Sequence, residues 1–325
     1  GALRIMGYVN ILEGHASNLM LVDPSGRPIQ QDVKTQVYDF ELGNSCVVKA
    51  KHLMSYGGTF RHTEFQILLA PEGKSRNEGG AYFQDEILLS EHFRWAVGLR
   101  VDRFDILKNA VFSPRTSFMI KPAPGQTLRV SYSRAYMAPS MFQKYMQIPF
   151  MRRIGLGMID PRLAGIYFNF PVSALGNRDI KEQVLNGYEF GYAGIVARGR
   201  ASLGAVFYIN DSKGDFRFFQ IASYTSQNPP PGWPLPPSVL DALIAANAFG
   251  PGKGLPSVLS PQNLGRLRNK GLELSADARF NRFVTGFANY SWQARPDPKD
   301  YDIAILNLPP THRFNAGVSL DYKRY

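Results

Sequence analysis

Apolar and polar residues alternate strictly along several stretches of this chain, and a period of two restricts the folds that it can adopt. Residues 271–280 show the pattern most clearly, with Leu272 and Leu274 on one side of the extended backbone. Glu273 and Asp277 lie on the other side. The alternation recurs in 94–101, 128–136, 188–193 and 313–323. A period of two predicts β-strands whose two faces meet different surroundings.

Two all-β architectures produce such strands. A soluble sandwich turns its apolar face inward, whereas an outer-membrane barrel turns it to lipid and keeps the polar face in the lumen. Charges in the middle of strands, such as Arg100 and Asp277, favour the barrel. Aromatic residues toward strand ends, such as Tyr290 and Trp292, favour it as well. A soluble β-sandwich or propeller is the alternative, although no repeat of about 40–50 residues supports a propeller.

Composition excludes several other classes of protein. The 22 Phe, 16 Tyr and 3 Trp among 325 residues are too many for a disordered chain. The single cysteine, Cys46, excludes an internal disulfide and a cysteine-built zinc site. The sequence contains no run of 18 apolar residues, so no transmembrane helix is predicted. The net charge of +11 is spread over strands and loops, which does not suit nucleic-acid binding but suits lipopolysaccharide head groups or a basic lumen.

The alternation predicts twelve membrane crossings, at 2–12, 33–43, 47–61, 79–90, 93–104, 111–121, 127–136, 187–197, 201–223, 265–280, 283–294 and 311–323. Tight turns are expected at 43–46, 90–92, 122–126, 198–200 and 281–282. These turns alternate with longer connections, as a barrel with short periplasmic turns and long outer loops requires. At about 3.3 Å per residue, 201–223 is too long for one bilayer. We therefore expect this segment to project beyond the membrane or to bend at 210–214.

The two longest connections, 137–186 and 224–264, are expected to be outer loops. Loops of this length are usually functional or disordered, so an ordered binding loop and a floppy surface loop are the two alternatives. The first connection contains Arg152, Arg153 and Arg162 among Met, Phe and Tyr residues. The second contains a proline-rich run at 228–237, typical of polyproline II structure. Ser238 is expected to cap a short helix that continues to Ala248, before Gly250 and Pro251 end it.

Eight short motifs occur in a fixed order along these expected strands. They are SYGGTFR at 55–61, GAYFQDE at 80–86, GLRVD at 98–102, FSPR at 112–115, LRVSYSRAY at 128–136, YEFGY at 188–192, NKGLEL at 269–274 and PPTHRFN at 309–315. In this order they resemble the barrel portion of TonB-dependent outer-membrane receptors. The resemblance covers about residues 47–322.

This resemblance implies an all-β fold, an antiparallel transmembrane β-barrel with long extracellular loops. Receptors of this class have 22 strands and a plugged lumen, so the chain is expected to supply about 12 strands of a larger, 22-stranded barrel. No segment resembles the plug or an energy-coupling box, and 175–182 lacks two prolines of the family pattern. Two open sheet edges in lipid are costly. We therefore expect 1–325 to be a partial barrel and not the functional unit by itself.

The resemblance also implies a function in the bacterial outer membrane. Such receptors bind a scarce nutrient, such as an iron–siderophore complex or cobalamin, and import it with energy from a TonB-type protein that acts through the plug. The expected partners are this TonB-type protein, the nutrient, and outer-membrane lipid with lipopolysaccharide; nucleic acid and cofactors are not expected. The alternative is a passive porin or a surface-binding barrel without energy coupling.

No catalytic or metal-binding pattern is present in the sequence. The five histidines lack metal-ligand spacing, and no nucleophile elbow occurs. Adjacent carboxylates such as Asp85 and Glu86 face opposite sides of a strand. The chain is therefore expected to be neither an enzyme nor a metal-binding protein.

Substrate contacts are expected where a strand meets the longest loop. The residues are Arg134, Tyr136, Gln143, Lys144 and Tyr145. Aromatic and cationic groups at this place suit a chelate or another anionic ligand. A simpler interpretation is that Arg134 and Tyr136 anchor the outer interface of the membrane.

Overall fold

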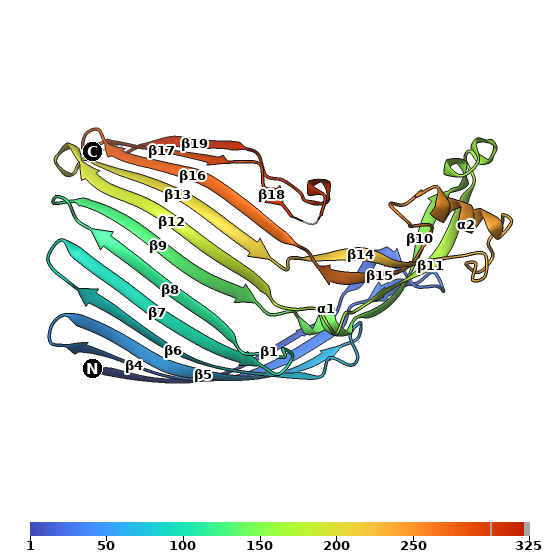
Figure 1. Cartoon of the computed structure of the whole chain (residues 1–325), viewed down its shortest axis with the longest axis horizontal. Helices are drawn as coiled ribbons and strands as arrows, with labels where there is room; N and C mark the ends of the chain where they lie inside the picture. Colours follow the sequence, from blue (N-terminus) through green and yellow to red (C-terminus); the bar gives the residue numbers. More distant parts are fainter. Residues whose placement is uncertain (300, 322–325) are drawn as a thin grey trace.

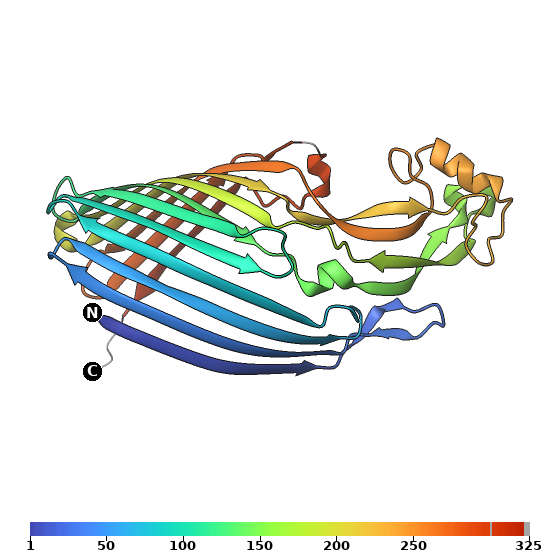
Figure 2. The same ribbon diagram turned by 60° about the horizontal axis from the view of Figure 1, so that its bottom comes forward.

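One long antiparallel sheet makes up most of the chain (Figures 1 and 2). The computed structural model describes residues 1–299 and 301–321. Twelve strands follow one another across the sheet: β1 (Ala2–Gly14), β4 (Val33–Val48), β5 (His52–Ile67), β6 (Ser75–Leu88), β7 (Phe93–Phe104), β8 (Val111–Ile120), β9 (Gln126–Met137), β12 (Gln183–Val196), β13 (Ala201–Lys213), β16 (Arg266–Arg279), β17 (Val284–Gln293) and β19 (His312–Leu320). The short β18 (Asp297–Pro298) pairs with β16. The predicted antiparallel barrel fold with about twelve strands is confirmed, except that residues 322 and 323 of the last expected strand lie outside the described residues.

Short turns lie at one end of this sheet, near the N-terminus, and the long connections lie at the other end (Figure 1). The turn predicted at 43–46 is wrong, because Gly43 and Asn44 pair with Gly57 and Tyr56 in the ladder. The chain turns instead at 49–51. Gly43 serves packing rather than turning, since a Cβ there would lie 2.8 Å from the Tyr82 hydroxyl.

The segment 201–223 bends, as its length predicts. β13 ends at Lys213, and β14 (Phe216–Ser223) belongs to a different sheet. Gly214 lies between them with a φ of +82°, a left-handed conformation that glycine adopts without a steric penalty. A two-residue connection thus redirects the chain from the main sheet into the outer loops.

The two longest connections fold together at the far end of the molecule (Figure 1). Their four-stranded sheet has the order β10 (Gln147–Gly155), β11 (Tyr167–Leu175), β15 (Pro256–Asn263) and β14. β11 and β15 are parallel, whereas the other two pairs are antiparallel. The unit also contains α1 (Met141–Tyr145), α2 (Ser238–Ala245), η1 (Leu156–Met158) and η2 (Pro161–Leu163). Outside it lie the hairpin of β2 (Ser17–Val22) and β3 (Pro28–Gln30), with η3 (Ala197–Gly199) and η4 (Ile303–Ile305). We call the four-stranded sheet with its helices the loop unit.

Helix α2 forms where a helix is expected, but its start and end differ from the prediction. Pro237 and not Ser238 occupies the N-cap position, and no side chain caps the helix. The proline ring fixes φ near the helical value, so it starts a helix without a capping hydrogen bond. The helix ends at Ala245, three residues early, and Asn247 has a φ of +54°.

The apolar core lies in the loop unit and not against the main sheet. Phe170, Val172, Leu240 and Leu255 are at most 2% exposed. Ile29 of β3 joins the same cluster. The core therefore fixes the arrangement of the long connections relative to one another.

Large apolar side chains on one face of the main sheet have no protein cover. Phe40 and Phe190 are each 50% exposed, Leu274 is 41% and Val318 is 67%. A sandwich would bury these side chains under a second sheet, whereas a lipid-facing wall leaves them free. Among the described residues no helix is long and apolar enough to span a membrane.

Candidate functional site

The predicted contact residues Gln143, Lys144 and Tyr145 lie on α1, which follows β9 at the long-loop end. Ser140 caps this helix: its hydroxyl accepts from the Gln143 N–H at 3.1 Å, and the Gln143 side chain accepts from the Ser140 N–H at 2.7 Å. This reciprocal pair is a capping box, which fixes the first turn of a helix. The Gln143 amide therefore has a structural partner.

Lys144 points into the protein. It is 8% exposed, and its Nζ donates to the Ile106 carbonyl at 2.6 Å. Burial lowers the pKa of the Lys144 amine, because the charged form loses hydration. The lysine thus fastens α1 to the connection between β7 and β8.

Tyr136 and Arg134 lie on β9 with different surroundings. The Tyr136 hydroxyl donates to Asp102 on β7, and its ring meets the edge of Phe104 at 6.0 Å between centroids. Arg134 is exposed and pairs in register with Asn186 of β12. The five predicted residues therefore do not form one cluster, and their contact with a substrate stays a prediction.

Tyr145 is the predicted residue whose ring contacts an exposed arginine. The Arg178 guanidinium lies 5.6 Å from its ring centroid, a distance typical of a cation–π contact. Arg178 also pairs with Glu72, whose other oxygen accepts from Gln147 at 2.9 Å. This group joins α1 to the loop between β5 and β6.

A second aromatic–cation pair lies on the four-stranded sheet. The Arg153 guanidinium lies 3.9 Å from the centroid of the Tyr167 ring, and Tyr167 is 58% exposed. Within the described chain no carboxylate pairs with Arg152 or Arg153. The sequence analysis singles out both arginines as basic residues of the long loop. It does not predict the contact with Tyr167, because that contact depends on the register of β10 with β11.

Arg162 differs from these two arginines because it has an acidic partner. Its side chain is 89% exposed and lies 2.6 Å from Asp160. The hydrogen bonds from Arg162 lower the pKa of Asp160 to about 2. The positive charge of Arg162 is thus largely balanced within its own turn.

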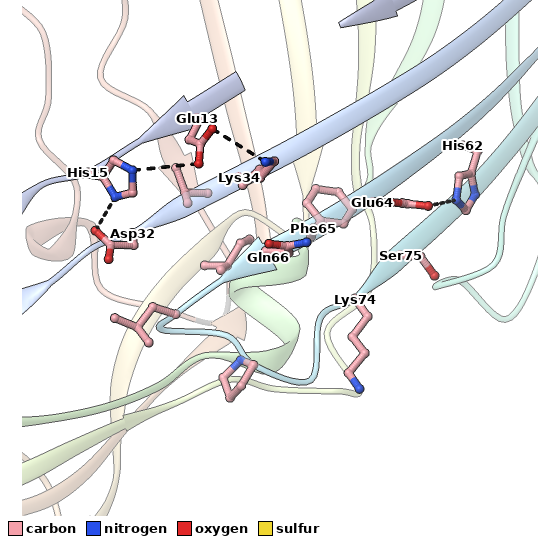
Figure 3. A pocket seen from close by; sticks show the side chains of 14 residues that line it. Glu13, His15, Asp32, Lys34, His62, Glu64, Phe65, Gln66, Lys74 and Ser75 are labelled. Atoms are coloured by element: carbon pink, nitrogen blue, oxygen red, sulfur yellow. Dashed lines mark ion pairs between the residues drawn. The ribbon is translucent and has the colours of Figure 1, made fainter. Parts of the chain in front are cut away.

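A pocket of about 870 Å³ lies at the long-loop ends of β1, β4, β5 and β6 (Figure 3). His15 lies between Glu13 and Asp32, with its Nδ1 3.2 Å from the Asp32 carboxylate. Lys34 lies 3.7 Å from Glu13. The lining carries both signs of charge, and no three His, Cys, Asp or Glu residues in the described ranges are arranged to hold a metal ion. The lining of the pocket therefore suits a polar ligand.

The other face of the sheet, opposite to the side chains of Lys34, His62 and Glu64, carries a charged network nearer the middle of the strands. Arg61 contacts Asp39 at 2.6 Å and Glu78 at 3.5 Å. Arg100 contacts Asp102 at 2.6 Å and donates to Thr59 at 2.9 Å. These side chains enclose a hollow of about 230 Å³. Phe40 and Phe60, which are register partners, lie on the opposite face because side chains alternate along each strand.

The charged groups of this network are paired with one another. The arginines of the network are held by carboxylates and hydroxyls of their own strand or of neighbouring strands. A nucleophile beside a base, the geometry that covalent catalysis needs, is not formed by these groups. The chemistry available at this end of the sheet is recognition of a polar or charged ligand.

Comparison with known proteins gives a family and a fold. The family model described as TonB dependent receptor-like, beta-barrel matches residues 23–325. The siderophore receptor PirA from Pseudomonas aeruginosa is 12% identical with a TM-score of 0.62, over 91% of this chain and 51% of that one. PirA from Acinetobacter baumannii is 15% identical with a TM-score of 0.63, over 99% and 45%.

A third structure has the same fold. The FrpB iron transporter from Neisseria meningitidis is 15% identical with a TM-score of 0.55, over 90% of this chain and 40% of that one. The chain thus spans about half, or less, of the length of these structures. No curated protein matches the chain.

Proposed function

Because this chain belongs to the family of TonB-dependent receptor-like β-barrels, we propose that it forms part of the wall of an outer-membrane receptor for nutrient uptake. The observation that supports this most is the difference between the two faces of the sheet. One face leaves Phe40, Phe190 and Val318 uncovered, and the other carries the paired charges of Arg61 and Arg100. A wall between lipid and a wet lumen needs this difference.

The proposed nutrient is an iron–siderophore complex. The structural neighbours are named as siderophore receptors and an iron transporter. The loop unit offers Arg152 and Arg153 without carboxylate partners in its described residues, and the Arg153 guanidinium lies over the exposed ring of Tyr167. Guanidinium and aromatic groups suit an anionic chelate.

The proposed contact residues are Tyr145, Arg153 and Tyr167. Gln143 and Lys144 already have partners within the protein, and Tyr136 donates to Asp102. Arg134 lies apart from the loop unit on β9. The substrate proposal therefore does not depend on these four residues.

Transport in this proposal consists of binding and gating, with no bond made or broken. Energy comes from a TonB-type protein that acts on a plug within the lumen. The paired charges on the polar face of β5 and β7 give the lumen a polar surface for such a plug and for the moving ligand.

An uptake assay tests the proposal. Cells that carry the full-length protein are given radiolabelled ferric siderophore, in one strain with a working energy transducer and in one without it. We expect uptake only in the first strain. Equal uptake in both strains, with swelling of liposomes that contain the protein, would show a passive porin instead.

Substitutions test the proposed contacts. The double variant Arg153→Ala with Tyr167→Ala is expected to bind ferric siderophore roughly 10- to 100-fold more weakly, because one cation and one ring are lost. Arg162→Ala is the matched control, since this exposed arginine of the same loop is paired with Asp160. We expect the control to bind within about twofold of the wild type. Titration of the purified protein by fluorescence quenching measures both, and equal affinities would contradict the assignment.

A further inference from the structure

A row of polar side chains crosses four strands at the long-loop end of the apolar face. Arg134 of β9 pairs with Asn186 of β12, Asn186 with Asp211 of β13, and Asp211 with Arg268 of β16. Register partners in an antiparallel sheet lie on the same face. Lys270 lies one step nearer the middle of the sheet, opposite Ile209.

The neighbours of Asn186 show that the polar row lies on the apolar face of the sheet. The Tyr132 hydroxyl donates to the Asn186 side chain at 3.1 Å, and the Tyr132 and Tyr188 rings lie 5.1 Å apart. Both tyrosines line a hollow of about 410 Å³. Its other side chains are mainly apolar, among them Phe118, Val130, Phe190 and Phe207. The polar row therefore lies on the outward, apolar face and above this hollow.

The row carries an excess of positive charge. Arg268 contacts Asp211 at 2.6 Å and 2.9 Å, while 60% of its side chain stays exposed. Arg134 and Lys270 are exposed, and no carboxylate within the described ranges pairs with either. Asp297, the register partner of Arg268, lies 3.2 Å from Lys299. Two cations thus face outward without a counter-charge from the protein.

We propose that this surface binds a phosphorylated glycolipid of the outer leaflet. Its phosphates lie on Arg134, Lys270 and Arg268, and an acyl chain fills the hollow below the two tyrosines. The order along the sheet matches such a lipid: cations, then aromatic rings with a polar edge, then apolar side chains. A zwitterionic lipid would also fill the hollow, but the ammonium group of its head group would offset the charge of its single phosphate.

This inference rests on the outer-membrane location proposed above, but it does not depend on the substrate. It gives the positive charge of this face a definite position and partner. Arg134 thereby anchors the outer interface through the phosphate to which it binds.

Native mass spectrometry tests the proposal with full-length protein in detergent and bisphosphorylated lipid A as the probe. The double variant Arg134→Gln with Lys270→Gln is expected to bind lipid A about 30-fold more weakly. The matched control is Arg103→Gln, an exposed cation on the outward face of β7, outside the hollow. We expect the control to bind within about threefold of the wild type.

Two further measurements separate the parts of the site. Dephosphorylated lipid A should bind the wild type as weakly as intact lipid A binds the double variant. Val130→Trp fills the hollow and should weaken lipid binding while all the cations remain. Heat-dependent migration on denaturing gels shows that each variant is folded.

Three results would overturn the proposal. They are double-variant binding within twofold of the wild type, equal binding of the dephosphorylated lipid, or unchanged binding by the folded Val130→Trp variant. A failure of siderophore uptake with intact lipid binding would count against the proposed function alone. The experiments therefore distinguish a failure of the lipid site from a failure of the proposed uptake function.

Discussion

A side chain at residue 80 would occupy space that the Arg100–Asp102 pair now fills. A Cβ at Gly80 would overlap the Asp102 carboxylate and lie 2.8 Å from Arg100 Nη2. The missing side chain lets Arg100 reach across β6 to Thr59 on β5. A glycine in a strand often marks such a close approach and not a turn.

Replacing this glycine tests the packing. Gly80→Ala is expected to lower the free energy of unfolding by about 1–3 kcal/mol, because the ion pair must move. Gly79→Ala is the matched control: its Cβ would be 3.7 Å from the nearest atom, in ordinary contact. We expect less than about 0.5 kcal/mol for the control. Urea unfolding in micelles measures both, and equal losses would show that the space at Gly80 is unimportant.

Because Lys144 is buried, the stability of the loop unit should change with pH in the alkaline range. Because burial lowers the pKa of this amine below its usual value near 10.5, folding favours the neutral form. The folded chain binds fewer protons than the unfolded chain, so stability rises as pH increases toward that value. Lys144→Met should remove this part of the rise, whereas Lys51→Met, at an exposed turn, should keep it.

Protease resistance of 138–182 between about pH 8 and about pH 10 measures this dependence. An unchanged rise in the Lys144→Met variant would contradict it. The burial of Lys144 could not be predicted from the sequence. A lysine in a loop suggests a ligand contact, but its burial depends on Ile106, 38 positions earlier in the chain.

The loop unit has a core of its own, and its stability should depend on that core. Phe170 is 2% exposed and contacts Phe168 and Tyr224. Phe170→Ala is expected to destabilise this unit by about 3–5 kcal/mol. Phe218→Ala, on β14 of the same sheet and 53% exposed, is the matched control.

Hydrogen exchange measures where these losses fall. In the Phe170 variant we expect faster exchange in β10 and β11 and unchanged protection in β5 and β6. Faster exchange across the main sheet would instead show that the loop unit and the wall unfold together. The control should leave both regions protected.

The elements of the main sheet are predictable from sequence because each strand meets two surroundings. Alternation along 271–280 predicts β16, and the length of 201–223 predicts the bend at Gly214. The turn at 43–46 is mispredicted because Gly43 and Asn44 suggest a turn, whereas Gly43 makes room for Tyr82. The four-stranded sheet is not predictable, since the pairing of Ser173 with Val258 joins distant segments without an alternating pattern.

At the scale of the whole molecule, the proposed function depends on which face of the sheet contacts lipid. Phe190→Arg places a charge on the apolar face and is expected to cost about 2–4 kcal/mol in bilayers, because lipid does not solvate it. Asn289→Arg is the matched control on the polar face, where the residue is exposed. We expect the control to fold with nearly wild-type stability.

Equilibrium unfolding in lipid vesicles compares the two variants. A tolerated Phe190→Arg with a destabilised Asn289→Arg would reverse the assignment of lumen and lipid. The eight motifs predict the family at this scale because they lie on strands whose register is fixed. They leave the ligand open, because the pairing of Arg153 with Tyr167 belongs to the loops.

The parallel contact between β11 and β15 ties together the two longest excursions from the wall. Residues of both excursions, such as Phe170 and Leu240, share a single core. A chimera that exchanges one excursion with that of another receptor would leave half a core without its complement. Under the proposed function, the two excursions together would determine which ligand is bound, and new specificities are expected to arise by coordinated change in both.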